Sequence, residues 1–139
     1  MKTRLRDVRV LVADDDALIR SALSDLIEGR PGLALVGTVG DAESAIALAI
    51  SSRPDVAVLD YRLPGGGGVH AAREITRLCP GTAVLCLSAY GDPGTASKML
   101  GAGAREFLIK GVSSNEDIVV SILAAARIAQ DPRDRSAAG

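Results

Sequence analysis

Short apolar runs alternate with longer amphipathic segments five times along the chain. The runs are nearly continuous in Val, Leu, Ile and Ala, a pattern typical of strands that are covered on both faces. The sequence predicts five such strands, at residues 8–13, 33–38, 55–60, 83–87 and 105–109. Each run is too short to be a helix of ordinary length, so we interpret all five as buried strands.

Between these runs, apolar positions recur at helical spacing. The first stripe consists of Leu18, Ile19, Ala22, Leu23, Leu26 and Ile27, and Gly29 and Pro31 end it. Further helices are expected at residues 41–50, 68–78, 93–100 and 115–129, with Asp41 and either Ser114 or Asn115 as N-caps. This alternation predicts an α/β fold, a doubly wound parallel sheet with helices on both faces and right-handed crossovers.

Length and charge narrow the class of protein. At 139 residues the chain forms one domain, expected at residues 1–129, and residues 130–139 are expected to be a flexible tail or linker stub. A net charge of -1 argues against direct binding of nucleic acid by this chain. No apolar stretch approaches the roughly 18 to 20 residues of a membrane span, so we expect a cytoplasmic protein without membrane contact. Cys79 and Cys86 are expected to be inert thiols.

Polar residues stand at the ends of four predicted strands. They are the triplet Asp14, Asp15 and Asp16 after the first, Asp60 at the end of the third, Ser88 after the fourth and Lys110 after the fifth. Because the carboxyl ends of parallel strands lie along one edge of a sheet, we expect these groups to share a crevice. Asp60, held by a rigid scaffold yet open to solvent, suits a nucleophile.

In this order the motifs resemble the response-regulator receiver domain of bacterial two-component signalling. The resemblance covers residues 8–129 and rests on the pair Asp14-Asp15, on Asp60 followed by Leu63-Pro64-Gly65 and Gly68, on Ser88-Ala89, and on Phe107 three residues before Lys110. It implies a flavodoxin-like fold whose five-stranded parallel sheet has the order 2-1-3-4-5 and is flanked by five helices. That architecture agrees with the alternation of apolar runs and helical segments.

The resemblance also implies a reaction. A sensor histidine kinase would donate a phosphoryl group to Asp60. Each pair of like charges about 4 Å apart costs on the order of 4 kcal/mol at an effective dielectric near 20, so the acids require a cation. The resemblance implies Mg²⁺, held by Asp15 and Asp60 directly, by Asp14 through water and by the backbone carbonyl of Arg62; oxygen ligands suit this ion.

Further roles follow from the same resemblance. Lys110 would pair with Asp60 and then with a phosphoryl oxygen, and the hydroxyl of Ser88 would donate to another oxygen. Phe107 would be the aromatic side chain that rotates on phosphorylation, and Arg62 and Tyr90 would adjust the lifetime of the phosphate. Such a chain is no enzyme for other molecules, because it catalyses only its own phosphorylation and dephosphorylation. The fourth and fifth helices would bind a second copy or an effector domain.

Two other functions remain open at this point. A haloacid-dehalogenase-like phosphatase would use Asp14 and Asp16, but it needs a further acidic pair on a strand, whereas Glu116 and Asp117 stand at a predicted helix start. A flavin or nucleotide binder of the same topology needs a phosphate loop. The glycine run at residues 65–68 is not followed by Gly-Lys-Ser or Gly-Lys-Thr, so it gives that function little support.

Overall fold

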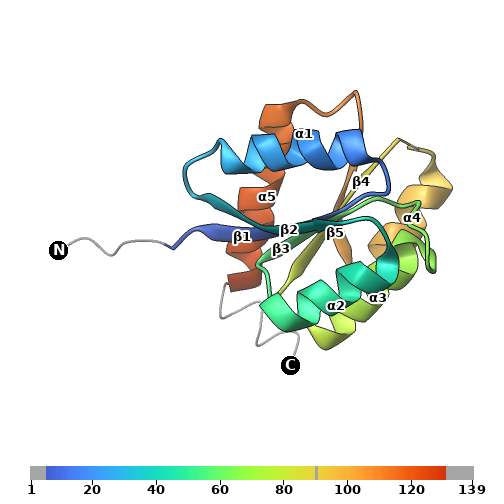
Figure 1. Ribbon diagram of the computed structural model, residues 1–139. Coiled ribbons are helices and arrows are strands. Elements are labelled where there is room, and N and C mark those ends of the chain that lie inside the picture. Colours follow the sequence, from blue (N-terminus) through green and yellow to red (C-terminus); the bar gives the residue numbers. More distant parts are fainter. Residues whose placement is uncertain (1–5, 90, 131–139) are drawn as a thin grey trace.

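The computed structural model describes residues 6–89 and 91–130, which form five strands alternating with five helices (Figure 1). The strands are β1 (Val8–Ala13), β2 (Leu33–Val39), β3 (Val56–Leu59), β4 (Ala83–Ser88) and β5 (Ala104–Ile109). The helices are α1 (Ala17–Glu28), α2 (Ala42–Ser52), α3 (Gly67–Leu78), α4 (Pro93–Gly101) and α5 (Asn115–Gln130). Every expected element is present, and its ends lie within two residues of the expectation. Helix α5 includes the first residue of the expected tail, and residues 131–139 lie outside the described residues.

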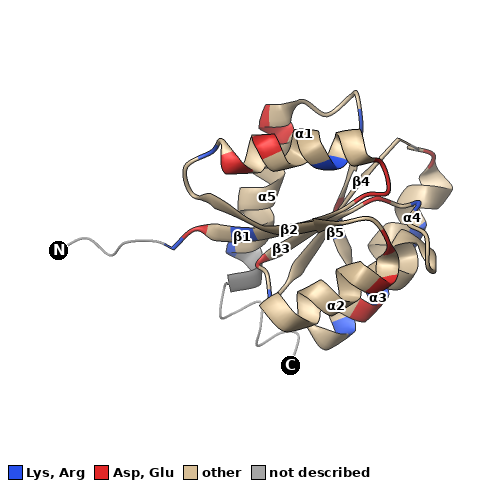
Figure 2. Cartoon of the chain, in the orientation of Figure 1, with Lys and Arg blue, Asp and Glu red and all other residues tan. Residues whose placement is uncertain are grey.

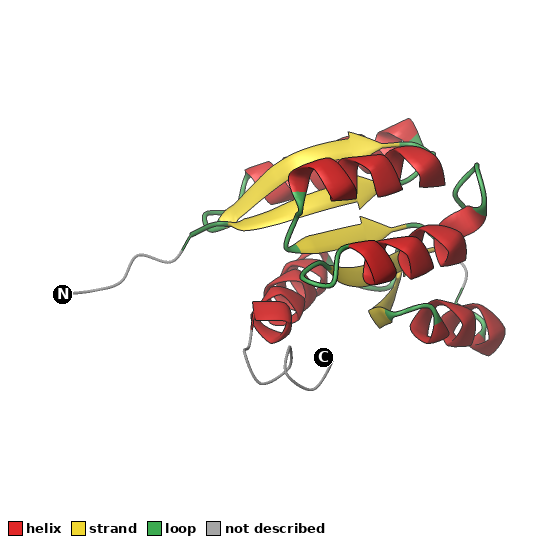
Figure 3. Cartoon of the chain, turned by 90° about the horizontal axis from the view of Figure 1, so that it is seen from below, coloured by secondary structure: helices red, strands yellow, loops and turns green. Residues whose placement is uncertain are grey.

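All strands run parallel in one sheet of order β2-β1-β3-β4-β5, which confirms the predicted topology (Figure 3). The register places Ala13 opposite Leu59, and Ser88 opposite Ile109. The residues that follow these pairs are Asp14, Asp60 and Lys110. The sheet therefore brings the predicted site residues to one edge, as the order of the motifs requires.

Helices cover both faces of the sheet. Helices α1 and α5 pack on one face with Val10, Val12, Val56 and Val58, and helices α2, α3 and α4 pack on the other with Leu11, Ala13, Ala57 and Leu59 (Figure 1). Alternate residues of the central strands thus belong to different cores. This arrangement explains why the strands read as continuous apolar runs. Within the described part of the chain, no helix has the length and apolar character needed to cross a membrane.

Side chains at the helix starts satisfy backbone donors that the helices leave unpaired. The carboxylate of Asp16 accepts from the N–H groups of Leu18 and Ile19, and Asp41 accepts from Ser44 at 2.7 Å. At the start of α5, Ser114 Oγ accepts from the N–H of Asp117 at 3.0 Å, and the carboxylate of Asp117 accepts from the N–H of Ser114 at 3.0 Å. This reciprocal pair is a capping box, so Ser114 is the cap. The expected caps at Asp41 and at this position are confirmed.

The first residues of α3 lie directly against the end of β3. The N–H of Gly68 donates to the carbonyl of Tyr61 at 2.7 Å. A methyl group at Gly68 would overlap the carbonyl oxygen of Asp60 and lie 2.8 Å from Cα of Tyr61. Both neighbours are backbone atoms, which cannot rotate away. The absent side chain of Gly68 therefore allows the turn after Asp60 to close.

Replacing Gly68 with Ala should destabilise the fold by about 1–3 kcal/mol, the usual cost of forcing extra atoms into a filled space. The free energy of unfolding in urea measures the effect. Gly81→Ala is the matched control, because nothing lies within 4 Å of the methyl group it would add. Equal stability of the two variants would contradict this account of the turn.

Candidate functional site

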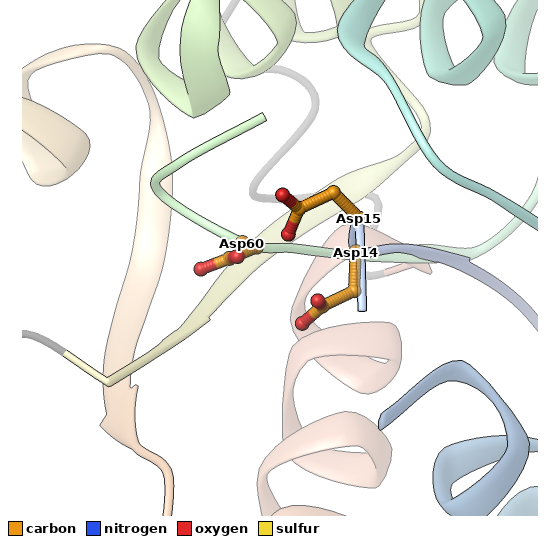
Figure 4. Close-up of side chains that lie close together, drawn as sticks. All are labelled: Asp14, Asp15 and Asp60. Atoms are coloured by element: carbon orange, nitrogen blue, oxygen red, sulfur yellow. The ribbon is translucent and has the colours of Figure 1, made fainter. Parts of the chain in front are cut away.

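Three carboxylates meet at the carboxyl edge of the sheet. Asp14 and Asp15 follow β1, Asp60 follows β3, and one oxygen from each lies within 4.8 Å of the others. Asp14 and Asp60 are buried, whereas Asp15 is exposed. Asp60 is therefore less open to solvent than expected from the sequence, because the strand end and the turn after it enclose the carboxylate. The close-up shows all three side chains projecting to the same side of the strand ends (Figure 4). The turn from β1 into α1 carries these acidic residues and is coloured red in Figure 2.

Lys110 enters this acidic cluster from the end of β5. Its Nζ lies 2.6 Å from Oδ2 of Asp14 and 3.5 Å from Oδ2 of Asp60. The expected pairing with Asp60 is present, but the shorter contact is with Asp14. Burial alone would lower the pKa of Lys110; the hydrogen bond from Asp14 and the charges of both carboxylates outweigh this effect and raise the pKa. Lys110 is therefore a fixed positive charge between two buried acids.

Asp14 uses both of its carboxylate oxygens within the protein. Oδ1 accepts a hydrogen bond of 2.9 Å from the N–H of Asp16, and Oδ2 holds Lys110. The N–H of Asp14 donates to the carbonyl of Val39 at 3.0 Å, which ties the end of β1 to the end of β2. Asp14 thus organises the edge of the sheet from a buried position.

The electrostatic surroundings of Asp60 disfavour its charged form. Burial raises the pKa of Asp60, and the negative charge of Asp14 raises it further. Lys110 and the backbone N–H of Arg62, which donates to the carboxylate, act in the opposite direction without cancelling the rise in pKa. Asp60 is a buried carboxylate with an incompletely compensated charge, and such groups are concentrated at functional sites.

The remaining predicted residues surround this cluster. Ser88 is fully buried at the end of β4, and its carbonyl accepts from the N–H of Lys110 at 2.9 Å. Phe107 on β5 is half-buried and packs against the core beneath α2, α3 and α4. Arg62 is exposed beside Asp60, and Tyr90 lies outside the described residues.

Both cysteines are free and buried, as expected for inert thiols. Cys86 is the nearer to the site. Burial raises the pKa of its thiol to about 12, with a further contribution from the charge of Asp60. A thiol with that pKa is uncharged at neutral pH and is a poor nucleophile.

The donor set fits a magnesium ion. Mg²⁺ takes oxygen ligands at about 2.1 Å, so the ligands of one ion lie within roughly 4 Å of one another, and these three carboxylates offer oxygens within 4.8 Å of one another. The three acids carry more negative charge than Lys110 balances. The exposure of Asp15 leaves one side of the cluster open to solvent, and Mg²⁺ usually keeps several waters. Asp15 and Asp60 are the residues that would hold the ion directly, and Asp14 would contact it through water.

The protein belongs to the doubly wound α/β class, with an open parallel sheet, helices on both faces and an acidic site at the carboxyl edge of the sheet. The family model described as the response regulator receiver domain matches residues 10–122. The chain belongs to this family and is a receiver domain of two-component signalling. The match gives no support to a haloacid-dehalogenase-like phosphatase, and Asp16, which that function would need as its second acid, caps α1.

Relatives of known sequence and structure agree with this assignment. The chain is 35% identical over 109 residues to the DNA-binding transcriptional activator DevR/DosR of Mycobacterium tuberculosis, an alignment that covers 78% of this chain and 50% of that protein. It is 36% identical over 121 residues to protein-glutamate methylesterase/protein-glutamine glutaminase 2 of Pseudomonas fluorescens. That alignment covers 84% of this chain and 32% of the relative. The signal receiver domain of the putative response regulator NarL from Mycobacterium tuberculosis superposes with a TM-score of 0.83 at 35% identity. The superposition covers 88% of this chain and 98% of that domain.

The chain spans about half the length of DevR/DosR and a third of the methylesterase. These relatives differ in what their names say they do, one being a DNA-binding activator and the other an enzyme. What they have in common with this chain is the receiver portion.

The structure brings together most of the residues that sequence reasoning selected. Asp14, Asp15, Asp60 and Lys110 share one cluster, with Ser88 in the adjoining strand end. Sequence reasoning missed the contact of Arg20 on α1, whose Nη1 donates to the carbonyl oxygen of Asp14 at 2.7 Å. Arg20 stands six residues after Asp14, and that spacing alone does not indicate a contact between a side chain and a carbonyl.

In buffer without Mg²⁺, Asp60→Asn should be more stable than the parent at neutral pH. Because the pKa of Asp60 is raised in the folded state, the folded chain binds more protons there, and stability falls as pH rises from the ordinary value of 3.8 through the raised one. The neutral amide avoids this loss, and Asp14 still holds Lys110. Urea unfolding at neutral and acidic pH measures the difference, which should shrink in acid.

The control for this measurement is Asp25→Asn, which changes an exposed acid on α1. It should lack the gain in stability that Asp60→Asn shows at neutral pH. A parent more stable than Asp60→Asn at neutral pH would contradict the electrostatic account of the site.

Proposed function

We propose that Asp60 accepts a phosphoryl group from the phosphohistidine of a sensor histidine kinase, and that the aspartyl phosphate switches the output surface of the domain. The observation that carries this proposal is the position of Asp60. It is a buried carboxylate at a strand end, 3.5 Å from the ammonium group of Lys110 and beside two further acids. Phosphoryl transfer depends mostly on positioning and charge neutralisation, and these residues supply both.

In the proposed reaction a carboxylate oxygen of Asp60 attacks the phosphorus atom. A new oxygen–phosphorus bond forms, and the phosphorus–nitrogen bond of the phosphohistidine breaks, with its electron pair going to the imidazole. Lys110 binds a phosphoryl oxygen, and the hydroxyl of Ser88 donates to another. Water later attacks the phosphorus atom, the phosphorus–oxygen bond to Asp60 breaks, and inorganic phosphate leaves as the carboxylate is restored. The chain catalyses only these two reactions on itself.

Magnesium is the implied cofactor, and when bound it neutralises charge that the acids and the phosphoryl group would otherwise bring together. Asp15 and Asp60 would hold it directly and Asp14 through water, which agrees with the engagement of both Asp14 oxygens by the protein. The backbone carbonyl of Arg62 remains the predicted fourth protein ligand. Arg62 and Tyr90 remain the residues predicted to adjust phosphate lifetime.

The proposed output surface comprises α4, β5 and α5. Ser88 and Phe107 lie on neighbouring strands beneath it, so a movement of one near the phosphoryl group can be accommodated by rotation of the other. A second copy of this chain or an effector domain would bind there. We assign no nucleic-acid or membrane binding to the chain itself, and we propose a cytoplasmic location, where a kinase can reach Asp60.

Incubation with acetyl phosphate and Mg²⁺ should add one phosphoryl group to the parent, detectable by intact mass spectrometry. Asp60→Asn should remain unmodified, because both carboxylate oxygens of Asp14 are engaged within the protein and Asp15 is exposed, away from the shorter contacts of Lys110. Asp25→Asn is the matched control and should be modified as fast as the parent. An equal rate of modification in Asp60→Asn would refute the assignment of the phosphoacceptor.

A further inference from the structure

Arg20 binds the backbone of the acid pair from the first turn of α1. Its Nη1 donates to the carbonyl oxygen of Asp14 at 2.7 Å, and its own N–H donates to the carbonyl of Asp16 at 3.0 Å. The N–H of Asp16 in turn donates to the carboxylate of Asp14. Arg20 thus closes a small network around the turn between β1 and α1.

The oxygen that Arg20 holds belongs to the peptide unit between Asp14 and Asp15. A peptide unit is planar, so a hydrogen bond to its oxygen restrains the rotation of the whole unit, which includes the N and Cα atoms of Asp15. Asp14 has other constraints, because it is buried and both of its carboxylate oxygens are engaged. Asp15 is exposed, so packing contributes little to its direction. The orientation of Asp15 therefore depends on the peptide plane that Arg20 holds.

Gly40, between β2 and α2, leaves the space that the guanidinium needs. A methyl group on Gly40 would lie 3.2 Å from Nη1 of Arg20 and 3.9 Å from the carbonyl oxygen of Asp14. The first distance is shorter than an ordinary van der Waals contact, so the guanidinium would have to shift by a few tenths of an ångström. Gly40 and Arg20 thus form one structural unit next to the acid pair.

We propose that Arg20, with the space left by Gly40, is a positioning residue that orients Asp15 for Mg²⁺. This inference rests on the proposed function, since it assumes that Asp15 is a ligand of the ion. The contact of Arg20 with the acid pair is with the backbone carbonyl of Asp14.

The charge of Arg20 makes the proposal distinguishable from a simple electrostatic effect. Removing a positive charge near a cation site strengthens cation binding if charge alone matters. Losing a positioning contact weakens it, and loss of an outer-shell partner typically costs about 10- to 100-fold in metal affinity. The two effects have opposite signs, so the direction of the change in Mg²⁺ affinity identifies the role.

The test is the dissociation constant for Mg²⁺, measured by isothermal titration calorimetry, together with urea unfolding of each variant. Arg20→Met should weaken binding by about tenfold, and Arg20→Lys, which keeps a donor and the charge, should recover part of that loss. Gly40→Ala should weaken binding without any change in charge. Asp15→Ala gives the reference for loss of a ligand.

Matched controls lie away from the site. Arg9→Met removes the same charge and a comparable hydrogen bond, from Nη1 to the carbonyl of Arg53 at 3.0 Å, and Gly101→Ala adds a methyl group with nothing within 4 Å. Both should bind Mg²⁺ like the parent. If Arg20→Met binds Mg²⁺ as tightly as the parent, or more tightly, the positioning role of Arg20 is wrong. The proposed function of Asp60 is not affected by that result.

Two further outcomes are assigned in advance. If Arg20→Met does not fold, Gly40→Ala decides, and parent-like binding by it overturns the proposal. A parent protein that does not bind Mg²⁺ at all would refute the proposed function, and this inference with it.

Discussion

The structure depends on one electrostatic constraint, the confinement of three carboxylates at the edge of a buried sheet. Two of them, Asp14 and Asp60, are buried, and the ammonium group of Lys110 lies between them, 2.6 Å from Asp14 and 3.5 Å from Asp60. A buried ion pair stabilises little against an apolar alternative, and removing one partner is strongly destabilising. Lys110 therefore reduces the repulsion between the two buried carboxylates without neutralising the charge of the cluster. The negative charge that remains can attract a divalent cation.

The parallel fold makes this confinement possible. The carboxyl ends of β1, β3, β4 and β5 meet at one edge, and hydrogen bonds between them set the spacing: the N–H of Asp60 donates to the carbonyl of Ala13, and the N–H of Lys110 to that of Ser88. Two cores, one on each face, hold the strands rigid. The missing side chain of Gly68 lets the turn after Asp60 close.

Sequence reasoning identified the strands, the sheet order and the residues at the strand ends, because these depend on apolar periodicity and on where polar residues interrupt it. It identified Lys110 as a partner of Asp60 but not the shorter contact with Asp14, since both acids lie within reach and side-chain packing decides between them. It could not find the contact of Arg20 with the Asp14 carbonyl. Every residue has a backbone carbonyl, so the residue type at position 14 does not indicate that its carbonyl accepts a hydrogen bond. The proximity of Gly40 to Arg20 is likewise visible only in the folded structure.

The most direct test of this account is the titration of Asp60 itself, followed by the carboxyl carbon resonance in a carbon-13 labelled protein with and without Mg²⁺. If burial and the charge of Asp14 dominate, Asp60 titrates above the ordinary value of 3.8 in the absence of the ion, and Mg²⁺ lowers the pKa. A pKa of Asp60 at or below the ordinary value without Mg²⁺, unchanged when Mg²⁺ is added, would contradict the claim that the site is an incompletely compensated acidic cluster.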